Sequence, residues 1–314
     1  MTIGVVYGGT AEERGASEKN AKDITAVLSE RGHNAILFKF DNDIIKQLKR
    51  AEIEIVFLCV QGKGYGDGTF QRMLESAGIP YTGSGVKSAS LINNKILCKF
   101  YFDIFNIRTP KWDVLSKKVF GNNLYTYENF GFPFVAKAPT QGGSYGIELI
   151  KGMENIPNIN KVFRYDDPIL LESYISGRFY TVGLYEHEGR LVTLPVVEGV
   201  DLGDKDRRAA EIGSDIISFT GSYGIRKSDL SKEMEEEMQS MARTIFKVTG
   251  ALDVARVDFM VSDADGKPYA LEINAVPGLK KLSLMPKEAE LAGISYGDLI
   301  EDILKAAVRR SKDV

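Results

Sequence analysis

Cysteine, histidine and tryptophan are scarce in this 314-residue sequence, which has two, two and one of them. Cys59 and Cys98 lie far apart, one in an apolar run and the other in a helical pattern. We therefore expect buried, reduced thiols and a cytoplasmic protein. His33 follows a glycine at a predicted helix end, and His187 lies in a predicted turn. Neither belongs to a zinc-ligand spacing or a nucleophile motif, which argues against zinc chemistry and a Ser-His-Asp triad.

Long apolar runs and strong net charge are also missing. No apolar run reaches the length of a membrane span, and the formal net charge is −3. We therefore expect neither nucleic acid nor a membrane surface as a partner. The apolar share of 44% and the charged share of 26% are ordinary for a globular protein, and the length predicts two or three folding units.

The first ninety residues alternate between strand and helix patterns. This alternation predicts a parallel sheet covered by helices. The predicted strands and helices are residues 3–9 (strand), 17–32 (helix, with Ser17 at its start), 35–40 (strand), 53–60 (strand) and 68–78 (helix).

The remaining chain reads as two further regions that are rich in strands, which gives an α/β (α+β) protein with domains at 1–90, 91–176 and 177–314. Residues 199–230 are polar, contain glycine and show little periodicity. A loop of this length is usually a lid, a binding loop or a disordered segment. A basic lid would suit a phosphate ligand, and a solvated surface segment fits the pattern equally well. The basic candidates are Lys205, Arg207, Arg208 and Arg226.

The stretch "ARVDFMVSDADGKPYALEINAVPGL", residues 255–279, reads as a β-hairpin. If residues 263–267 form the loop, Ser262 faces Pro268. Asp258 then faces Glu272, and Arg256 faces Asn274. Since side chains alternate along strands, one face is apolar and the other carries this polar cluster. The predicted apolar face consists of Val257, Phe259, Leu271 and Ile273.

Two carboxylates directly opposite each other destabilise a hairpin unless a cation neutralises them. The oxygen atoms of Asp258, Glu272 and Asn274 suit Mg²⁺, or Mn²⁺ in its place. The three side chains are therefore candidate metal ligands, with Arg256 as a fixed positive charge beside them. A solvated hairpin face, on which Arg256 partly offsets the acids, is the alternative.

Glycine-rich turns suggest where a phosphate would bind. In "VAKAPTQGGSYG", residues 135–146, Gly142 and Gly143 allow backbone N–H groups to approach an anion, and Lys137 can reach a phosphate. Ser144 follows them and completes this cofactor-binding set. The turn is neither a Walker P-loop nor a GxGxxG fingerprint, and it could equally be a plain hairpin.

Two more loops follow predicted strands, "YGGTAEERGAS" at residues 7–17 and "QGKGYGDG" at residues 61–68. The first leads into a helix N-terminus, which favours an anion, and the second lies where α/β sheets bind ligands. Together the patterns indicate a cleft for a nucleotide, Mg²⁺ and a small anionic substrate.

The order of the motifs resembles the D-alanine–D-alanine ligase family of the ATP-grasp superfamily over nearly the whole chain. The matching stretches are "GGTAEER", "GKGYGDGTFQ", "GIPYTGSGV", "AKAPTQGGSYG", "LLESYISGR", "RVDFM", "EINAVPG" and "SLMPKEAELAGIS". The resemblance implies three domains, an N-terminal parallel-sheet domain followed by two antiparallel-sheet domains that clamp ATP. It also implies a homodimer and a role in peptidoglycan biosynthesis.

The resemblance assigns roles to residues around ATP. Lys95 and Lys137 match the family's phosphate-contacting lysines, and Glu172 matches the acid that meets the adenine amino group. Asp258 and Glu272, with Asn274, match its Mg²⁺ ligands, which agrees with the hairpin argument.

The same resemblance assigns the amino-acid sites. Arg256 and the backbone N–H of Gly278 match the oxyanion site. Glu13 matches the acid near the amine of the first substrate, and Ser283 with Leu284 matches the site for the carboxylate of the second. The implied reaction forms an acyl phosphate from ATP and one amino acid, and the amine of a second amino acid then attacks it.

Four positions differ from the family's usual residues. Gln61 stands where a His is usual, Gly66 for a Glu, Gly143 for a Ser, and Phe179 for the Glu that meets the ribose hydroxyls. These differences leave open a paralogue that joins a different carboxylate and amine. A catalytically silent nucleotide-binding protein is a third reading, against which the complete cluster around Arg256 argues.

Overall fold

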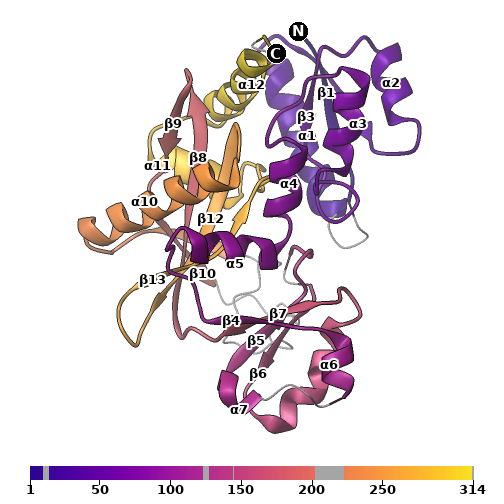
Figure 1. Ribbon diagram of the computed structural model, residues 1–314. Helices are drawn as coiled ribbons and strands as arrows, with labels where there is room; N and C mark the ends of the chain where they lie inside the picture. The colour runs from indigo at the N-terminus through magenta and orange to yellow at the C-terminus, as the bar shows by residue number, and fades with distance from the viewer. Residues whose placement is uncertain (10–13, 123–126, 144, 202–222, 313–314) are drawn as a thin grey trace.

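The computed structural model describes residues 1–9, 14–122, 127–143, 145–201 and 223–312, which form three β-sheets with helices packed on them (Figure 1). The expected arrangement of one parallel and two antiparallel sheets is confirmed. No helix of the described residues has both the length and the apolar character that crossing a membrane requires.

The N-terminal sheet is parallel, with the strand order β2-β1-β3. Its strands are apolar on both faces, as expected for a parallel sheet covered on both sides. Ile3 and Val5 pack under α1 and α12, and Val6 packs on the other face under α2 and α3. The elements are β1 (Thr2–Tyr7), α1 (Arg14–Glu30), β2 (Asn34–Lys39), α2 (Ile44–Arg50), β3 (Ile55–Leu58), α3 (Thr69–Ala77) and the C-terminal α12 (Tyr296–Lys312).

The second sheet is antiparallel, with the order β4-β7-β5-β6, and lies at the bottom of Figure 1. Phe134 and Ala136 on one face pack with α7 and α8, so this small sheet has its own apolar core. Helices α4 (Val86–Ile92) and α5 (Lys95–Ile104) lead into it. Its elements are β4 (Trp112–Leu115), α6 (Lys117–Gly121), α7 (Tyr127–Phe130), β5 (Phe134–Lys137), β6 (Ile147–Ile150), η1 (Met153–Asn158), α8 (Ile159–Val162) and β7 (Ile169–Ser173).

The third sheet is antiparallel, with the order β11-β10-β8-β12-β13 and with β9 paired to part of β8. Val257 and Phe259 pack under α10, where Met238 and Ile245 are buried. The opposite face carries polar residues and borders the pocket described below. The elements are β8 (Gly177–His187), β9 (Arg190–Thr193), β10 (Val197–Asp201), β11 (Tyr223–Lys227), α10 (Lys232–Thr249), β12 (Val254–Ser262), β13 (Pro268–Asn274) and α11 (Leu284–Leu291).

Apolar cores are shared across the predicted domain limits. Phe102 and Ile107 pack with β8 and β12, although the limits 1–90, 91–176 and 177–314 assign them to the central domain. Leu299 and Ile303 of α12 pack on the N-terminal sheet. The three limits stay a prediction, and the shared cores show how the sheets are held together.

The β12–β13 hairpin corrects the predicted register. Val261, not Ser262, pairs with Pro268, and a bulge after Asp258 restores the alignment of Asp258 with Glu272. Because of this bulge, Ala270 takes the buried position that was predicted for Leu271. The side chain of Leu271 lines the pocket instead.

The predicted start of the first helix is also wrong. Helix α1 already includes Arg14, and Ser17 is buried inside it. The Ser17 hydroxyl accepts the N–H of Gly8 at 3.0 Å and donates to the carbonyl of Cys59 at 2.6 Å. Ser17 therefore connects the ends of β1 and β3 and does not cap the helix.

The segment 199–230 is not one continuous loop. Its described ends belong to β10 and β11, which pair with each other. Arg226 contacts Glu198 at 2.7 Å, so one of the four basic lid candidates already has a protein partner. Lys205, Arg207 and Arg208 lie outside the described residues.

Candidate active site

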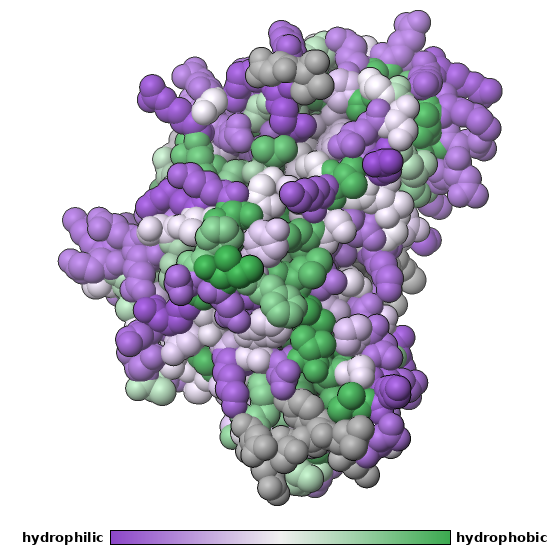
Figure 2. All heavy atoms as spheres, in the orientation of Figure 1, coloured by the Kyte–Doolittle hydropathy of each residue, from purple (hydrophilic) through white to green (hydrophobic). Residues whose placement is uncertain are grey.

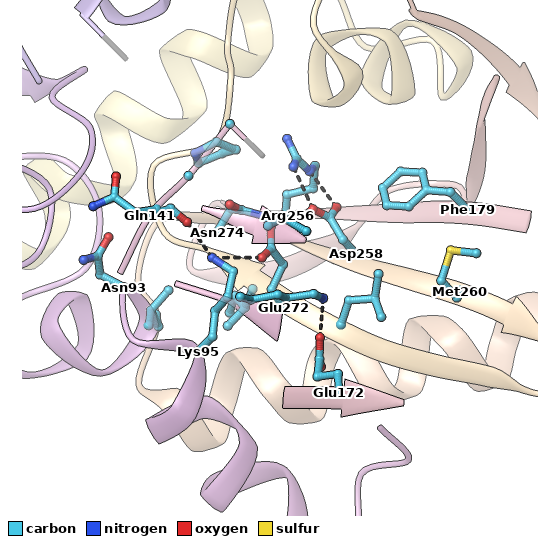
Figure 3. Close-up of a pocket in the computed structure, with 18 of the residues that line it drawn as sticks. Asn93, Lys95, Gln141, Glu172, Phe179, Arg256, Asp258, Met260, Glu272 and Asn274 are labelled. Carbon is cyan, nitrogen blue, oxygen red and sulfur yellow. Dashed lines mark hydrogen bonds and ion pairs between the residues drawn. The ribbon is translucent and has the colours of Figure 1, made fainter. Parts of the chain in front are cut away.

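A pocket of about 640 Å³ lies where the second and third sheets face each other (Figure 3). The ends of β5 and β7 contribute one wall, and β12 and β13 contribute the other. A loop after β3, from Val60 to Gly66, and the start of α5 close one end. Of the predicted site residues, the described ones that line this pocket are Lys95, Lys137, Gly142, Gly143, Glu172, Arg256, Asp258, Glu272, Asn274 and Gly278.

Asp258 is the centre of a hydrogen-bond network on the pocket face of β12. The guanidinium of Arg256 donates to it twice, from Nε and from Nη2, both at 2.8 Å. Asn274 Nδ2 donates at 3.0 Å from β13, and the Thr181 hydroxyl donates at 2.8 Å from β8. Burial disfavours the guanidinium charge, but Asp258 raises the pKa of Arg256. The predicted proximity of Arg256, Asp258 and Asn274 is confirmed.

Lys95 reaches the same cluster from the first residue of α5. Asn94 caps this helix by accepting the N–H groups of Ile96 and Leu97, which fixes where Lys95 points. Its Nζ donates to the carbonyl of Gln141 at 2.7 Å and lies 3.2 Å from Glu272 Oε2. Burial raises the pKa of Glu272 and the ammonium of Lys95 lowers it, with a net decrease.

Glu172 on β7 is buried between two lysines. It forms ion pairs with Lys137 on β5 and with Lys99 on α5. Burial alone would raise the pKa of Glu172, but the two lysines lower it to about 2. Lys99 is fully buried, and its desolvation lowers its own pKa. Lys137 and Glu172 therefore contact each other in this structure. The resemblance assigns them to opposite ends of ATP, Lys137 to the phosphates and Glu172 to the adenine.

One end of the pocket is apolar. Phe179, Met260 and Leu271 line it, while Asn93 and Gln141 lie at the other end, as Figure 3 shows for the labelled residues. The segment 173–177, which joins β7 to β8, also lines the pocket. An apolar slot of this kind is suited to a planar base.

The glycine-rich turn after β5 supplies backbone to the polar end. Gly143 has φ +61°, a left-handed conformation that favours glycine. The carbonyl of Gln141 already accepts Lys95. Ser144 lies outside the described residues, so its predicted role stays a prediction.

The two predicted amino-acid sites are described only in part. Gly278 lines the pocket, and a Cβ atom at Gly278 would lie 3.1 Å from Ser283 Oγ, so the two residues adjoin each other. Ser283 precedes the first turn of α11, and Leu284 is the first residue of that helix. Glu13 lies outside the described residues.

The donor set of the predicted metal site fits Mg²⁺ in chemical type. Asp258, Glu272 and Asn274 offer oxygen atoms from adjacent strands, which a hard cation prefers. Without an ion, Arg256 and Lys95 neutralise the two carboxylates. Within the described ranges no three His, Cys, Asp or Glu side chains gather into a metal-type cluster.

Sequence reasoning missed two functional neighbours. Lys99 follows Lys95 by four residues, the spacing that places both on one helix face, so a signal was present. Thr181 had no such signal, because it reaches Asp258 through the pairing of β8 with β12, and the sequence does not specify that pairing.

Two antiparallel sheets that enclose a pocket, with lysines at a polar end and an apolar slot at the other, define an ATP-grasp nucleotide-binding enzyme. Comparison with known proteins narrows the class. Residues 102–305 match the family profile described as D-ala D-ala ligase C-terminus. The chain is 31% identical to the D-alanine–D-alanine ligase of Desulforamulus reducens, over 99% of both chains. It is 32% identical to that of Geobacter sulfurreducens, over 99% of this chain and 95% of the relative.

A solved structure agrees with these relatives. The D-alanine–D-alanine ligase from Bacillus anthracis complexed with ATP superposes with a TM-score of 0.82 at 27% identity, covering 100% of this chain and 99% of that one. The chain belongs to the D-alanine–D-alanine ligase family. It is an ATP-dependent ligase that forms a C–N bond, and the predicted enzyme class is confirmed over a silent nucleotide-binding protein.

Proposed function

We propose that this protein joins two molecules of D-alanine, using ATP and releasing ADP and phosphate. The observation that carries the proposal is the set of three cations, Lys95, Lys137 and Arg256, that line the pocket around Glu272 and all lower its pKa. Three cations around one point suit a reaction in which negative charge passes from a triphosphate to an acyl phosphate. The names of the full-length relatives supply the amino acid.

The residues present suit both steps of this reaction. The lysines hold the phosphates while the carboxylate of the first D-alanine attacks the γ-phosphorus, which gives an acyl phosphate and ADP. The amine of the second D-alanine then attacks the acyl carbon. Arg256 and the N–H of Gly278 stabilise the tetrahedral oxyanion, and phosphate leaves. Phosphoryl transfer depends on positioning and charge, so no protein nucleophile is needed.

Mg²⁺ belongs to the proposal. Asp258, Glu272 and Asn274 would hold it, and it would neutralise phosphate charge during transfer. Arg256 and Lys95, which contact the two carboxylates in the absence of an ion, would then be released toward the phosphates and the oxyanion.

The function is tested by phosphate release from ATP in the presence of Mg²⁺, with D-alanine and with other D- and L-amino acids, singly and in pairs. We expect D-alanine alone to support turnover, and D-alanyl-D-alanine to appear in proportion to phosphate. Faster turnover with a different carboxylate would instead identify the paralogue that Gln61 and Gly143 left open.

We also propose that the protein is a homodimer that uses the outer face of α5. Ile104 is 69% exposed and Phe100 is 50% exposed, and Leu97 and Phe105 are exposed beside them. Figure 2 shows hydrophobic side chains gathered over α5 on this face of the molecule. Apolar residues at positions i, i+3, i+7 and i+8 of one helix form a stripe, and exposed stripes of this kind commonly mark protein interfaces.

A further inference from the structure

Glu288 on α11 is a fully buried acid that none of the roles above explains. Its Oε2 accepts the backbone N–H of Gly183 at 2.5 Å. Its Oε1 is buried and has no hydrogen-bond partner among the residues that the structure describes. Burying a carboxyl group is costly, so a side chain retained in this position invites a specific explanation.

The partner of Glu288 lies where β8 changes neighbours. Strand β8 pairs with β10 up to Thr181 and with β9 from Leu184 onward. Gly183 falls between them, and its N–H would have no strand partner there without Glu288. A buried N–H without a partner destabilises the folded state.

Gly183 also places Glu288 on the pocket face of the sheet. In the β8–β12 ladder Gly183 lies directly opposite Arg256. Side chains of opposite residues share a face, so the missing side chain of Gly183 would stand beside Arg256. A Cβ atom built there would lie 2.5 Å from Glu288 Oε2, so the carboxyl group of Glu288 fills that space.

Helix α11 carries this contact back to the pocket. Ser283 stands at the N-terminus of α11, five residues before Glu288, and adjoins Gly278. Met285 of the same helix packs in the apolar cluster with Leu279. Glu288 is therefore the polar attachment between α11 and the strand that faces Arg256.

We propose that Glu288 is a positioning residue: it attaches α11 to β8 at Gly183 and thereby holds Ser283 at the correct place relative to Arg256 for binding the second amino acid. This inference rests on the proposed function for its substrate. It assigns no contact between Glu288 and a substrate, since Glu288 does not line the pocket.

The attachment works with a neutral carboxyl group. Burial raises the pKa of Glu288 to about 8. The charge of Arg256 and the hydrogen bond from Gly183 lower this pKa, and the negative charge of Asp258 raises it. At neutral pH the group is therefore mostly protonated. Glutamine, which keeps the shape and the acceptor oxygen, is a matched replacement, and leucine keeps the volume without the acceptor.

The experiment compares Glu288→Gln, Glu288→Asp and Glu288→Leu with Glu290→Leu, a control on the exposed side of α11. Steady-state rates with D-alanine as the only amino acid give kcat, the KM for ATP and the KM for the second D-alanine. We expect Glu288→Leu to raise the KM for the second D-alanine about tenfold or more, with the KM for ATP nearly unchanged. Glu288→Asp, which draws the carboxyl group back, should show a smaller effect of the same kind, and serves if the leucine variant does not fold.

The glutamine variant separates positioning from other roles. It should match the wild type within about threefold in all constants. The proposal would be overturned if the leucine and glutamine variants had the same KM for the second D-alanine, whether both were normal or both were impaired. A general loss of stability would lower activity without a selective rise in the KM for the second D-alanine. Thermal unfolding of each variant measures that loss of stability.

A second measurement does not depend on the substrate. Hydrogen exchange of the peptide that covers 283–291 and of Gly183 should accelerate in Glu288→Leu and not in Glu288→Gln. If the wild type fails to use D-alanine, the proposed function fails while this measurement still decides whether Glu288 fixes α11. Unchanged exchange in the leucine variant would refute the attachment itself.

Discussion

At the scale of single residues, the polar end of the pocket is electrically balanced before any ligand binds. Arg256 is paired with Asp258, Lys95 with Glu272, and Lys137 with Glu172. Each pair satisfies a charge that would be costly to bury alone. A triphosphate must compete with these three carboxylates for Arg256 and the two lysines, and a bound divalent cation would remove two of the three competitors by coordinating Asp258 and Glu272.

Glu272→Gln tests this arrangement at the proposed metal site. The variant keeps the shape of the side chain but removes one anionic ligand, so we expect kcat to fall by about a hundredfold or more. Phosphate release at ordinary Mg²⁺ concentrations measures the effect, with Asp265→Asn in the exposed hairpin turn as the control. Near-normal turnover of Glu272→Gln would mean that this cluster does not hold the metal.

Glu288 makes stability depend on pH. Burial raises its pKa from the ordinary 4.5 to about 8, so between these values the folded chain binds more protons than the unfolded chain. Its stabilising contribution is complete below about pH 4.5 and is lost as the pH rises toward 8. Glu288→Gln lacks this titration. In urea unfolding between about pH 4.5 and pH 8, the free energy of unfolding of the variant should rise relative to that of the wild type. The expected rise is up to about 1.4 kcal/mol per pH unit. A constant difference between about pH 5 and pH 8 would show that Glu288 titrates normally.

At the scale of elements, the β12–β13 hairpin shows what the sequence could and could not predict. Alternation and the Asp-Gly turn correctly predicted a hairpin with Asp258 opposite Glu272. The bulge beside Asp258 was not predictable, because groups distant in sequence hold it: Ala270 donates to the carbonyl of Arg108 and accepts the hydroxyl of Thr109.

Among the other site residues, those within short motifs could be predicted from the sequence and those that depend on contacts between elements could not. The motifs at residues 135–146 and 272–278 correctly predicted many residues that line the pocket. Lys99 and Thr181 act through contacts between elements, and local patterns specify such contacts poorly. Glu172 was correctly placed in the pocket, but its pairing with two lysines depends on how α5 lies against β5 and β7.

The start of α5 couples a helix cap to the pocket. Asn94 caps the helix whose first residue, Lys95, contacts Glu272. We expect Asn94→Ala to lower the free energy of unfolding by about 1 kcal/mol and to raise the KM for ATP, because the first turn would fray and release Lys95. Asn94→Asp keeps a capping oxygen and should preserve stability. Urea unfolding and ATP kinetics on both variants give the comparison, and equal stability of the two would contradict the capping role.

At the scale of the whole molecule, elements far apart in sequence hold the sheets together. Arg310 on α12 donates to Asp253 at 2.8 Å and to the carbonyl of Tyr81 at 2.9 Å, which joins the C-terminal helix to the N-terminal and third sheets. Asp253 in turn accepts the N–H of Gly83 at 2.7 Å. Such contacts fix the sheet that carries the metal-ligand candidates relative to the loop that closes the pocket.

Self-association is tested at the same scale. Ile104→Glu introduces a charge into the exposed apolar stripe of α5, so we expect it to convert the proposed dimer to a monomer without loss of fold. Sedimentation of the wild type and the variant gives the masses, and Lys161→Glu on α8, which packs on the second sheet, is a surface control. A monomeric wild type, or a dimer that survives Ile104→Glu, would remove α5 from the interface.

The position of α12 also matters while the chain is being made. One face of the N-terminal sheet, with Ile3 and Val5, is covered in part by Leu299 and Ile303. These residues leave the ribosome about 240 residues after β3, which takes roughly 10 to 50 s at ordinary rates of translation. The N-terminal sheet is thus synthesised early, and the part of its apolar face that α12 covers stays uncovered until the end of synthesis.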